Sequence, residues 1–174
     1  MASASSALAL AAAGCSRNQI IKVNNGVGDL KEAPEESKQD EKLDAAQIQT
    51  QLGAALMQQG NMKEALDHLQ KAIGFDDKYV PAHTMLAILY ERTSQIPQAE
   101  REYRVALSVD PKDGGTNNNL GYFLCHHGQG KEGMEYLKRA LADPYYGTPA
   151  KANVNAGACL ADMGDRAGAE TYLR

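Results

Sequence analysis

The feature that most constrains the fold of this chain is a pattern of small residues that recurs every 34 positions. Two sets of three carry it, the second set twelve positions after the first: Gly53, Ala87 and Gly121, then Ala65, Ala99 and Gly133. A fixed period of this length is typical of helical hairpins that stack on one another. Small residues let the two helices of a hairpin approach closely, so the chain is expected to be all-α.

The period and its composition resemble the tetratricopeptide repeat, a helix–turn–helix unit of 34 residues. Large apolar residues occupy the seventh, eleventh and twenty-fourth positions of three successive repeats, at 46–79, 80–113 and 114–147. A fourth copy at 150–174 follows after two extra residues, with Gly157 and Ala169 in register. The resemblance implies a right-handed superhelical solenoid of about four repeats, of which the last is truncated.

Each repeat is expected to contribute two helices joined by a short turn. First helices are predicted near 45–59, 80–93, 116–127 and 149–163, and second helices near 62–75, 96–109, 130–142 and from 166 onward. The turns fall at Gly60, Ser94, Gly128 and Gly164. The fourth position of each repeat, usually a large aromatic residue in this family, is polar here: Gln49, His83, Asn117 and Asn153. Aromatic anchors are therefore expected to hold these first helices less firmly.

The N-terminus contains a short apolar run that ends at a cysteine. Residues Ala7–Ala13 are alanine and leucine, and Gly14 and Cys15 follow. Seven helical residues span roughly 10 Å, whereas a membrane-spanning helix needs ~20 residues. The run is interpreted as a signal peptide, and Ala12–Cys15 resembles a bacterial lipobox, in which the cysteine receives a lipid. The alternative is an alanine-rich tail with an incidental cysteine, because no Lys or Arg precedes the run.

The segment after this cysteine has the composition of a solvated linker. Residues 16–44 combine Lys, Glu, Asp, Asn and Pro with few large apolar residues, which predicts a disordered polar tether between the lipobox segment 1–15 and the repeat domain 45–174. In lipoprotein families an aspartate after the cysteine often causes retention in the inner membrane, so Ser16 indicates the outer membrane. Repeat arrays end in a polar capping helix, so we expect the natural protein to continue beyond Arg174.

The lipobox, the tether, the repeat spacing and the segment Asn118–Cys125 together resemble the type IV pilus biogenesis and stability lipoproteins, which include the pilotins of the pilus secretin. The resemblance implies a non-catalytic scaffold, lipid-anchored on the periplasmic face of the outer membrane. It would bind secretin subunits and promote their localisation and oligomerisation, on which twitching motility depends. Two other interpretations stay open: a periplasmic repeat lipoprotein of another envelope-assembly process, and a cytoplasmic tetratricopeptide scaffold.

In tetratricopeptide solenoids the first helices line a concave groove, chiefly through positions 2, 5, 9 and 12. The candidate partner-binding residues are Thr84, Ile88, Glu91, Asn118, Asn119, Tyr122, Cys125, Val154, Asn155 and Ala158. This largely uncharged set suits an extended or helical peptide with apolar anchors, whose backbone the three asparagines would hydrogen-bond. The alternative is that Tyr122 and Ile88 only pack against a neighbouring helix.

No pattern in the sequence indicates an enzyme, a metal site, a cofactor or a small-molecule substrate. Cys125, His126 and His127 are adjacent on a predicted helix, where successive side chains point about 100° apart and do not converge on a metal. The net charge of −4 provides no basic stripe for nucleic acid. Cys125 and Cys159 lie on neighbouring first helices, but their repeat positions differ in direction, which favours two buried thiols over a disulfide.

Overall fold

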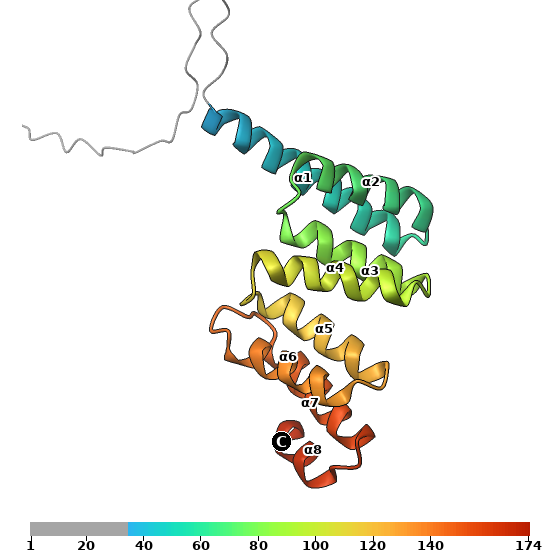
Figure 1. Cartoon of the computed structure of the whole chain (residues 1–174), viewed down its shortest axis with the longest axis vertical. Helices are drawn as coiled ribbons and strands as arrows, with labels where there is room; N and C mark the ends of the chain where they lie inside the picture. The colour runs from blue at the N-terminus through green and yellow to red at the C-terminus, as the bar shows by residue number, and fades with distance from the viewer. Residues whose placement is uncertain (1–34) are drawn as a thin grey trace, which may run out of the picture. The chain divides into compact units, whose positions relative to one another are not determined.

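The computed structural model describes residues 35–174, which form eight α-helices and no β-strand (Figure 1). The helices are α1 (Glu35–Gln58), α2 (Met62–Phe75), α3 (Val80–Arg92), α4 (Ile96–Val109), α5 (Gly114–His126), α6 (Gly130–Ala142), α7 (Pro149–Asp162) and α8 (Arg166–Leu173). The all-α prediction is confirmed. Cys15, the lipobox and most of the predicted tether lie outside the described residues.

The helices pair into four hairpins, in which each odd-numbered helix packs most extensively against the helix that follows it. Successive hairpins then stack, as the order of colours in Figure 1 shows for α1 to α8. The stacking contacts between first helices join α1 to α3 and α5 to α7, and second helices contact the next first helix. This arrangement is that of a tetratricopeptide solenoid.

The turn inside each hairpin depends on a residue with a positive φ angle. Glycine supplies it three times, at Gly60, Gly128 and Gly164, with φ between 79° and 84°. The second hairpin uses Ser94 at the same position of the repeat, with φ of 59°. A side chain in this left-handed region costs roughly 1 kcal/mol that glycine avoids. The turns were predicted at these four residues, and each first helix ends within two residues of its predicted end.

The prediction that residues 16–44 form a disordered tether is wrong for residues 35–44. Helix α1 begins at Glu35, ten residues before the predicted start. This segment is rich in Glu, Lys, Gln and Asp, a composition that is also typical of linkers. Glu, Lys and Gln are nevertheless good helix formers, so this composition is compatible with a solvated helix.

The small residues of the repeat pattern lie where the helices of each hairpin come closest. All eight are buried: Gly53, Ala65, Ala87, Ala99, Gly121, Gly133, Gly157 and Ala169. In the third hairpin the backbones of α5 and α6 approach closely. A Cβ atom built on Gly133 would lie 2.7 Å from the carbonyl oxygen of Gly121, and one built on Gly121 would lie 2.8 Å from that of Gly133. Side chains are therefore excluded at both positions. Leu52, a large apolar residue of the first repeat, is 43% exposed, because no described helix precedes α1.

Polar contacts replace the aromatic anchors at the fourth repeat position. Gln49 Oε1 lies 2.7 Å from His68 Nδ1, and His83 Nδ1 lies 2.9 Å from Glu102 Oε2 in a buried pair one repeat later. In the third repeat the Asn117 amide donates to the carbonyl oxygens of Pro111 and Asp113. The first helices of the first three repeats are thus held by hydrogen bonds to the second helix or to the preceding loop, which the sequence alone did not indicate.

Candidate functional site

Helices α3, α5 and α7 border a hollow of about 470 Å³, to which α4 adds one residue. We call this hollow the groove. The residues that line it are Ile88, Glu91, Arg92, Tyr103, Asn118, Asn119, Tyr122, Lys151 and Asn155. Six of them were among the ten candidate partner-binding residues: Ile88, Glu91, Asn118, Asn119, Tyr122 and Asn155. The structure therefore brings most of the predicted set together in one place.

The other four candidates do not line the groove. Thr84 hydrogen-bonds through its hydroxyl to Thr116 at 2.7 Å, between the second and third repeats. Cys125 forms a disulfide. Val154 and Ala158 are exposed on α7, outside the groove lining. The candidates at positions 5 and 9 of the fourth repeat, Val154 and Ala158, are therefore not part of the groove, whose lining on α7 is Lys151 and Asn155.

Three lining residues were not predicted from the sequence: Arg92, Tyr103 and Lys151. Lys151 holds the second position of the fourth repeat, which the positional rule includes, so the sequence did contain a signal for it. Arg92 follows position 12 by one residue, and Tyr103 belongs to the core of a second helix. The lining shifts from late positions on α3 to early positions on α7, as expected when successive repeats rotate relative to one another.

Asn118 acts as a link between helices rather than as a free ligand-binding group. Its side chain is only 1% exposed. Its Oδ1 accepts a hydrogen bond of 2.9 Å from Asn155 Nδ2, and its Nδ2 donates one of 3.3 Å to Asn119 Oδ1. The expectation that Asn118 bonds a partner's backbone is therefore corrected: it positions Asn119 and Asn155, which are half-buried in the groove wall.

The α3 side of the groove carries one carboxylate, Glu91, which accepts a hydrogen bond from a buried tyrosine. The Tyr103 hydroxyl donates to Glu91 Oε2 at 3.2 Å. Burial raises the pKa of Tyr103 well above its usual range, and the Glu91 charge raises it further. The phenol therefore keeps its proton and fixes the orientation of the Glu91 carboxylate.

Tyr122 offers an aromatic surface in the lining of the groove. Its side chain is 39% exposed, and its ring lies edge-on to the ring of His126, with centroids 4.2 Å apart. Ile88, on α3, is half-buried against the cores of the first three repeats. Ile88 therefore contacts both the core and the groove, so packing and partner contact are not exclusive roles for it.

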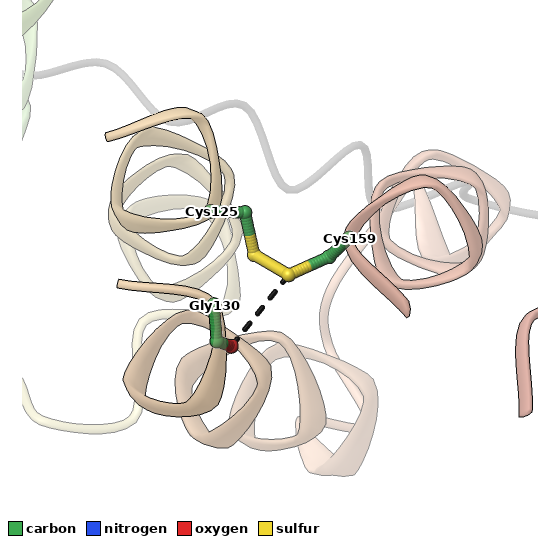
Figure 2. The surroundings of a disulfide bond; sticks show 3 residues. All are labelled: Cys125, Gly130 and Cys159. Atoms are coloured by element: carbon green, nitrogen blue, oxygen red, sulfur yellow. Dashed lines mark hydrogen bonds between the residues drawn. A yellow bond between two sulfur atoms is a disulfide. The ribbon is translucent and has the colours of Figure 1, made fainter. Parts of the chain in front are cut away.

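A disulfide joins α5 to α7 beyond the groove, contrary to the expectation of two thiols. Figure 2 shows Cys125 and Cys159 bonded through sulfur, with the Gly130 carbonyl oxygen beside Cys159. The two Cα atoms are 5.5 Å apart, and Cys159 Sγ lies 3.6 Å from the Gly130 carbonyl oxygen. Side-chain direction was the argument against pairing. That argument fails because the two helices approach to a separation at which a disulfide is readily formed.

The histidines after Cys125 point to different surroundings. His126 contacts Tyr122, and His127 packs at 4.4 Å between ring centroids against Phe123. Within residues 35–174, no group of three His, Cys, Asp or Glu side chains is arranged to hold a metal ion. In the same range, no helix combines the length and the apolar character needed to cross a membrane.

Stacked helical hairpins with a groove along their first helices define a tetratricopeptide-repeat protein, a class that typically acts as a non-catalytic scaffold for protein partners. A family model described as the tetratricopeptide repeat matches residues 56–115. The chain is also homologous to the type IV pilus assembly protein PilF of Pseudomonas aeruginosa, with 30% identity over 146 residues, or 84% of this chain and 57% of that protein.

Two solved structures extend the comparison. The crystal structure of PilW, a widely conserved type IV pilus biogenesis factor, superimposes with a TM-score of 0.71 and 36% identity over 73% of this chain. The structure of Pseudomonas aeruginosa PilF gives a TM-score of 0.71 and 31% identity over 77% of this chain. The chain covers 58% of the PilW chain and 59% of the PilF chain, so it spans somewhat more than half of either relative.

Proposed function

We propose that this protein is an outer-membrane lipoprotein that binds secretin subunits and promotes their localisation and oligomerisation during type IV pilus biogenesis. The observation that carries the proposal is the similarity to PilF and PilW, which extends over 73% to 84% of the chain. A protein segment from the secretin would occupy that groove.

The disulfide supports a location outside the cytoplasm. Structural disulfides persist in oxidising compartments such as the bacterial periplasm and are rare in the reducing cytosol. The Cys125–Cys159 bond therefore disfavours a cytoplasmic scaffold. The lipobox-like sequence that ends at Cys15 suggests the means of attachment to a membrane, and Ser16 favours the outer one.

The dimensions and chemistry of the groove suit a peptide. Its volume of about 470 Å³ accommodates a few side chains. Tyr122 supplies an aromatic contact, and the amides of Asn119 and Asn155 flank it with groups that pair with an extended backbone.

Replacement of Tyr122 by Ala is expected to weaken secretin capture about tenfold, because an aromatic contact at the centre of an interface is lost. Affinity for the periplasmic part of the secretin is measured with the purified chain. Secretin multimers and twitching motility are scored in a deletion strain that expresses each variant. Tyr145→Ala is the matched control, since Tyr145 is 93% exposed in the loop after α6, outside the groove. Equal capture by the two variants, with circular dichroism unchanged, contradicts the assignment of the groove.

Replacement of Cys15 by Ala is expected to release the protein from the membrane fraction, because the lipid would have no attachment point. Cell fractionation and labelling with a radioactive fatty acid measure the change. A protein that is never membrane-associated, with or without Cys15, contradicts lipid anchoring. An anchored protein whose deletion leaves secretin multimers intact points instead to another envelope-assembly process.

A further inference from the structure

We propose that the groove selects an extended segment in which a carboxylate side chain lies beside an aromatic or large apolar one. The carboxylate pairs with Lys151, and the apolar side chain packs between Tyr122 and Ile88. This inference rests on the proposed function, because it names the chemistry of the segment that such a groove would hold.

Charge in the groove is positive, although the chain as a whole carries a net charge of −4. The charged residues that line it are Glu91, Arg92 and Lys151. Within residues 35–174, neither cation has a carboxylate within ion-pair distance. Arg92 reaches the Met57 carbonyl oxygen at 3.4 Å, and Glu91 already accepts the Tyr103 hydroxyl. Lys151 differs from Arg92 in that its ammonium group has no hydrogen bond to any described residue, so it is the cation with all its donors available to a partner.

The position of Lys151 strengthens its preference for an anion. It is exposed in the first turn of α7, where the helix dipole adds partial positive charge. The hydrogen bond between Asn155 and Asn118 holds α7 against α5, so the backbone that carries Lys151 is fixed relative to α5. A segment that covered Lys151 without a carboxylate would remove water from an unpaired charge, which is unfavourable.

The rest of the wall specifies an extended backbone beside the carboxylate. Among the described residues, the Asn119 amide nitrogen and the Asn155 amide oxygen have no hydrogen-bond partner. One donor and one acceptor match the carbonyl and the amide of a peptide unit. Tyr122 and Ile88 then receive an apolar side chain next to that unit. The same wall offers an isolated cation rather than the basic stripe that nucleic acid needs.

Selection of 12-residue peptides from a random phage library tests the proposal on the full 174-residue chain. The unmodified chain is expected to enrich Asp or Glu near Phe, Tyr or Leu. Lys151→Glu is expected to lose the acidic enrichment and to gain Lys or Arg. Lys63→Glu is the charge-matched control, because Lys63 is exposed on α2, outside the groove lining, and its selection should match that of the unmodified chain.

Fluorescence anisotropy with one selected acidic peptide supplies the magnitude. Lys151→Glu should weaken binding about tenfold and Lys151→Gln about threefold, while Lys63→Glu should change it by less than about twofold. Absence of any enriched peptide, or the same acidic enrichment with Lys151→Glu, overturns the proposal.

Secretin capture, run in parallel, separates this inference from the proposed function. A chain that selects acidic and aromatic peptides but does not capture the secretin supports the groove chemistry and refutes the partner. Capture that is unaffected by Lys151→Glu, with no acidic enrichment in the selection, supports the partner and overturns the groove chemistry.

Discussion

Replacement of both Cys125 and Cys159 by Ala is expected to lower the free energy of unfolding by about 4 kcal/mol. The two cysteines are 34 residues apart. In the loop-closure model, closing a loop of that length lowers the entropy of the unfolded chain and so raises its free energy by about 4 kcal/mol. Alanine is chosen because Cys159 is only 2% exposed, and a serine hydroxyl would have to be buried there. Urea unfolding followed by circular dichroism measures the difference.

Reductant provides the control for this prediction. Dithiothreitol should lower the stability of the unmodified chain to nearly that of the double variant and should not affect the variant itself. The sequence has three cysteines, so thiol labelling of the non-lipidated, oxidised chain should find Cys15 alone. Three reactive thiols in denaturant, before reduction, would show that the bond does not form.

The disulfide also bears on the groove, because it joins the same two helices as the asparagine link. Asn118 and Asn155 hold α5 to α7 inside the groove, and Cys125 and Cys159 hold the same helices further along. Two separate links restrict both the distance and the angle between α5 and α7. The positions of Tyr122 and Lys151 relative to each other depend on that restraint.

The repeat period was sufficient to predict the fold, because the small residues of the pattern lie between the two helices of a hairpin and allow those helices to pack closely. Gly53 and Ala65, for example, lie twelve residues apart and face each other across one hairpin. The start of α1 was not predictable in the same way. Seven of its first ten residues are charged and the segment has little apolar periodicity, so composition alone did not distinguish a solvated helix from a linker.

The groove was predictable in part, and its errors have a common cause. The positional rule treats every repeat as identical, which placed Val154 and Ala158 in the groove. Lys151 holds the second position, which the rule also includes, but it was not among the candidates. Two extra residues precede the fourth repeat, and the lining on α7 falls at Lys151 and Asn155. The disulfide was missed for a related reason, since it depends on the distance between two helices, and a repeat position gives only direction.

Replacement of Gly133 by Ala is expected to lower the free energy of unfolding by about 1 kcal/mol, although Ala is the better helix former and the more usual residue here. The added Cβ would lie 2.6 Å from Cys125 Sγ and 2.7 Å from the Gly121 carbonyl oxygen. Backbone atoms cannot move aside as a flexible side chain does, and overpacking of this kind costs about 1–3 kcal/mol, more than the gain of about 1 kcal/mol in helix propensity.

Gly74→Ala is the matched control, because Gly74 lies on α2 and a methyl group added there would meet no atom within 4 Å. It should raise the free energy of unfolding by up to about 1 kcal/mol through helix propensity alone. Urea unfolding of the two variants under oxidising conditions gives the comparison. Stabilisation by both substitutions would mean that α5 and α6 lie further apart than the Gly121–Gly133 contact requires, and the close approach of small residues would no longer explain the 34-residue period.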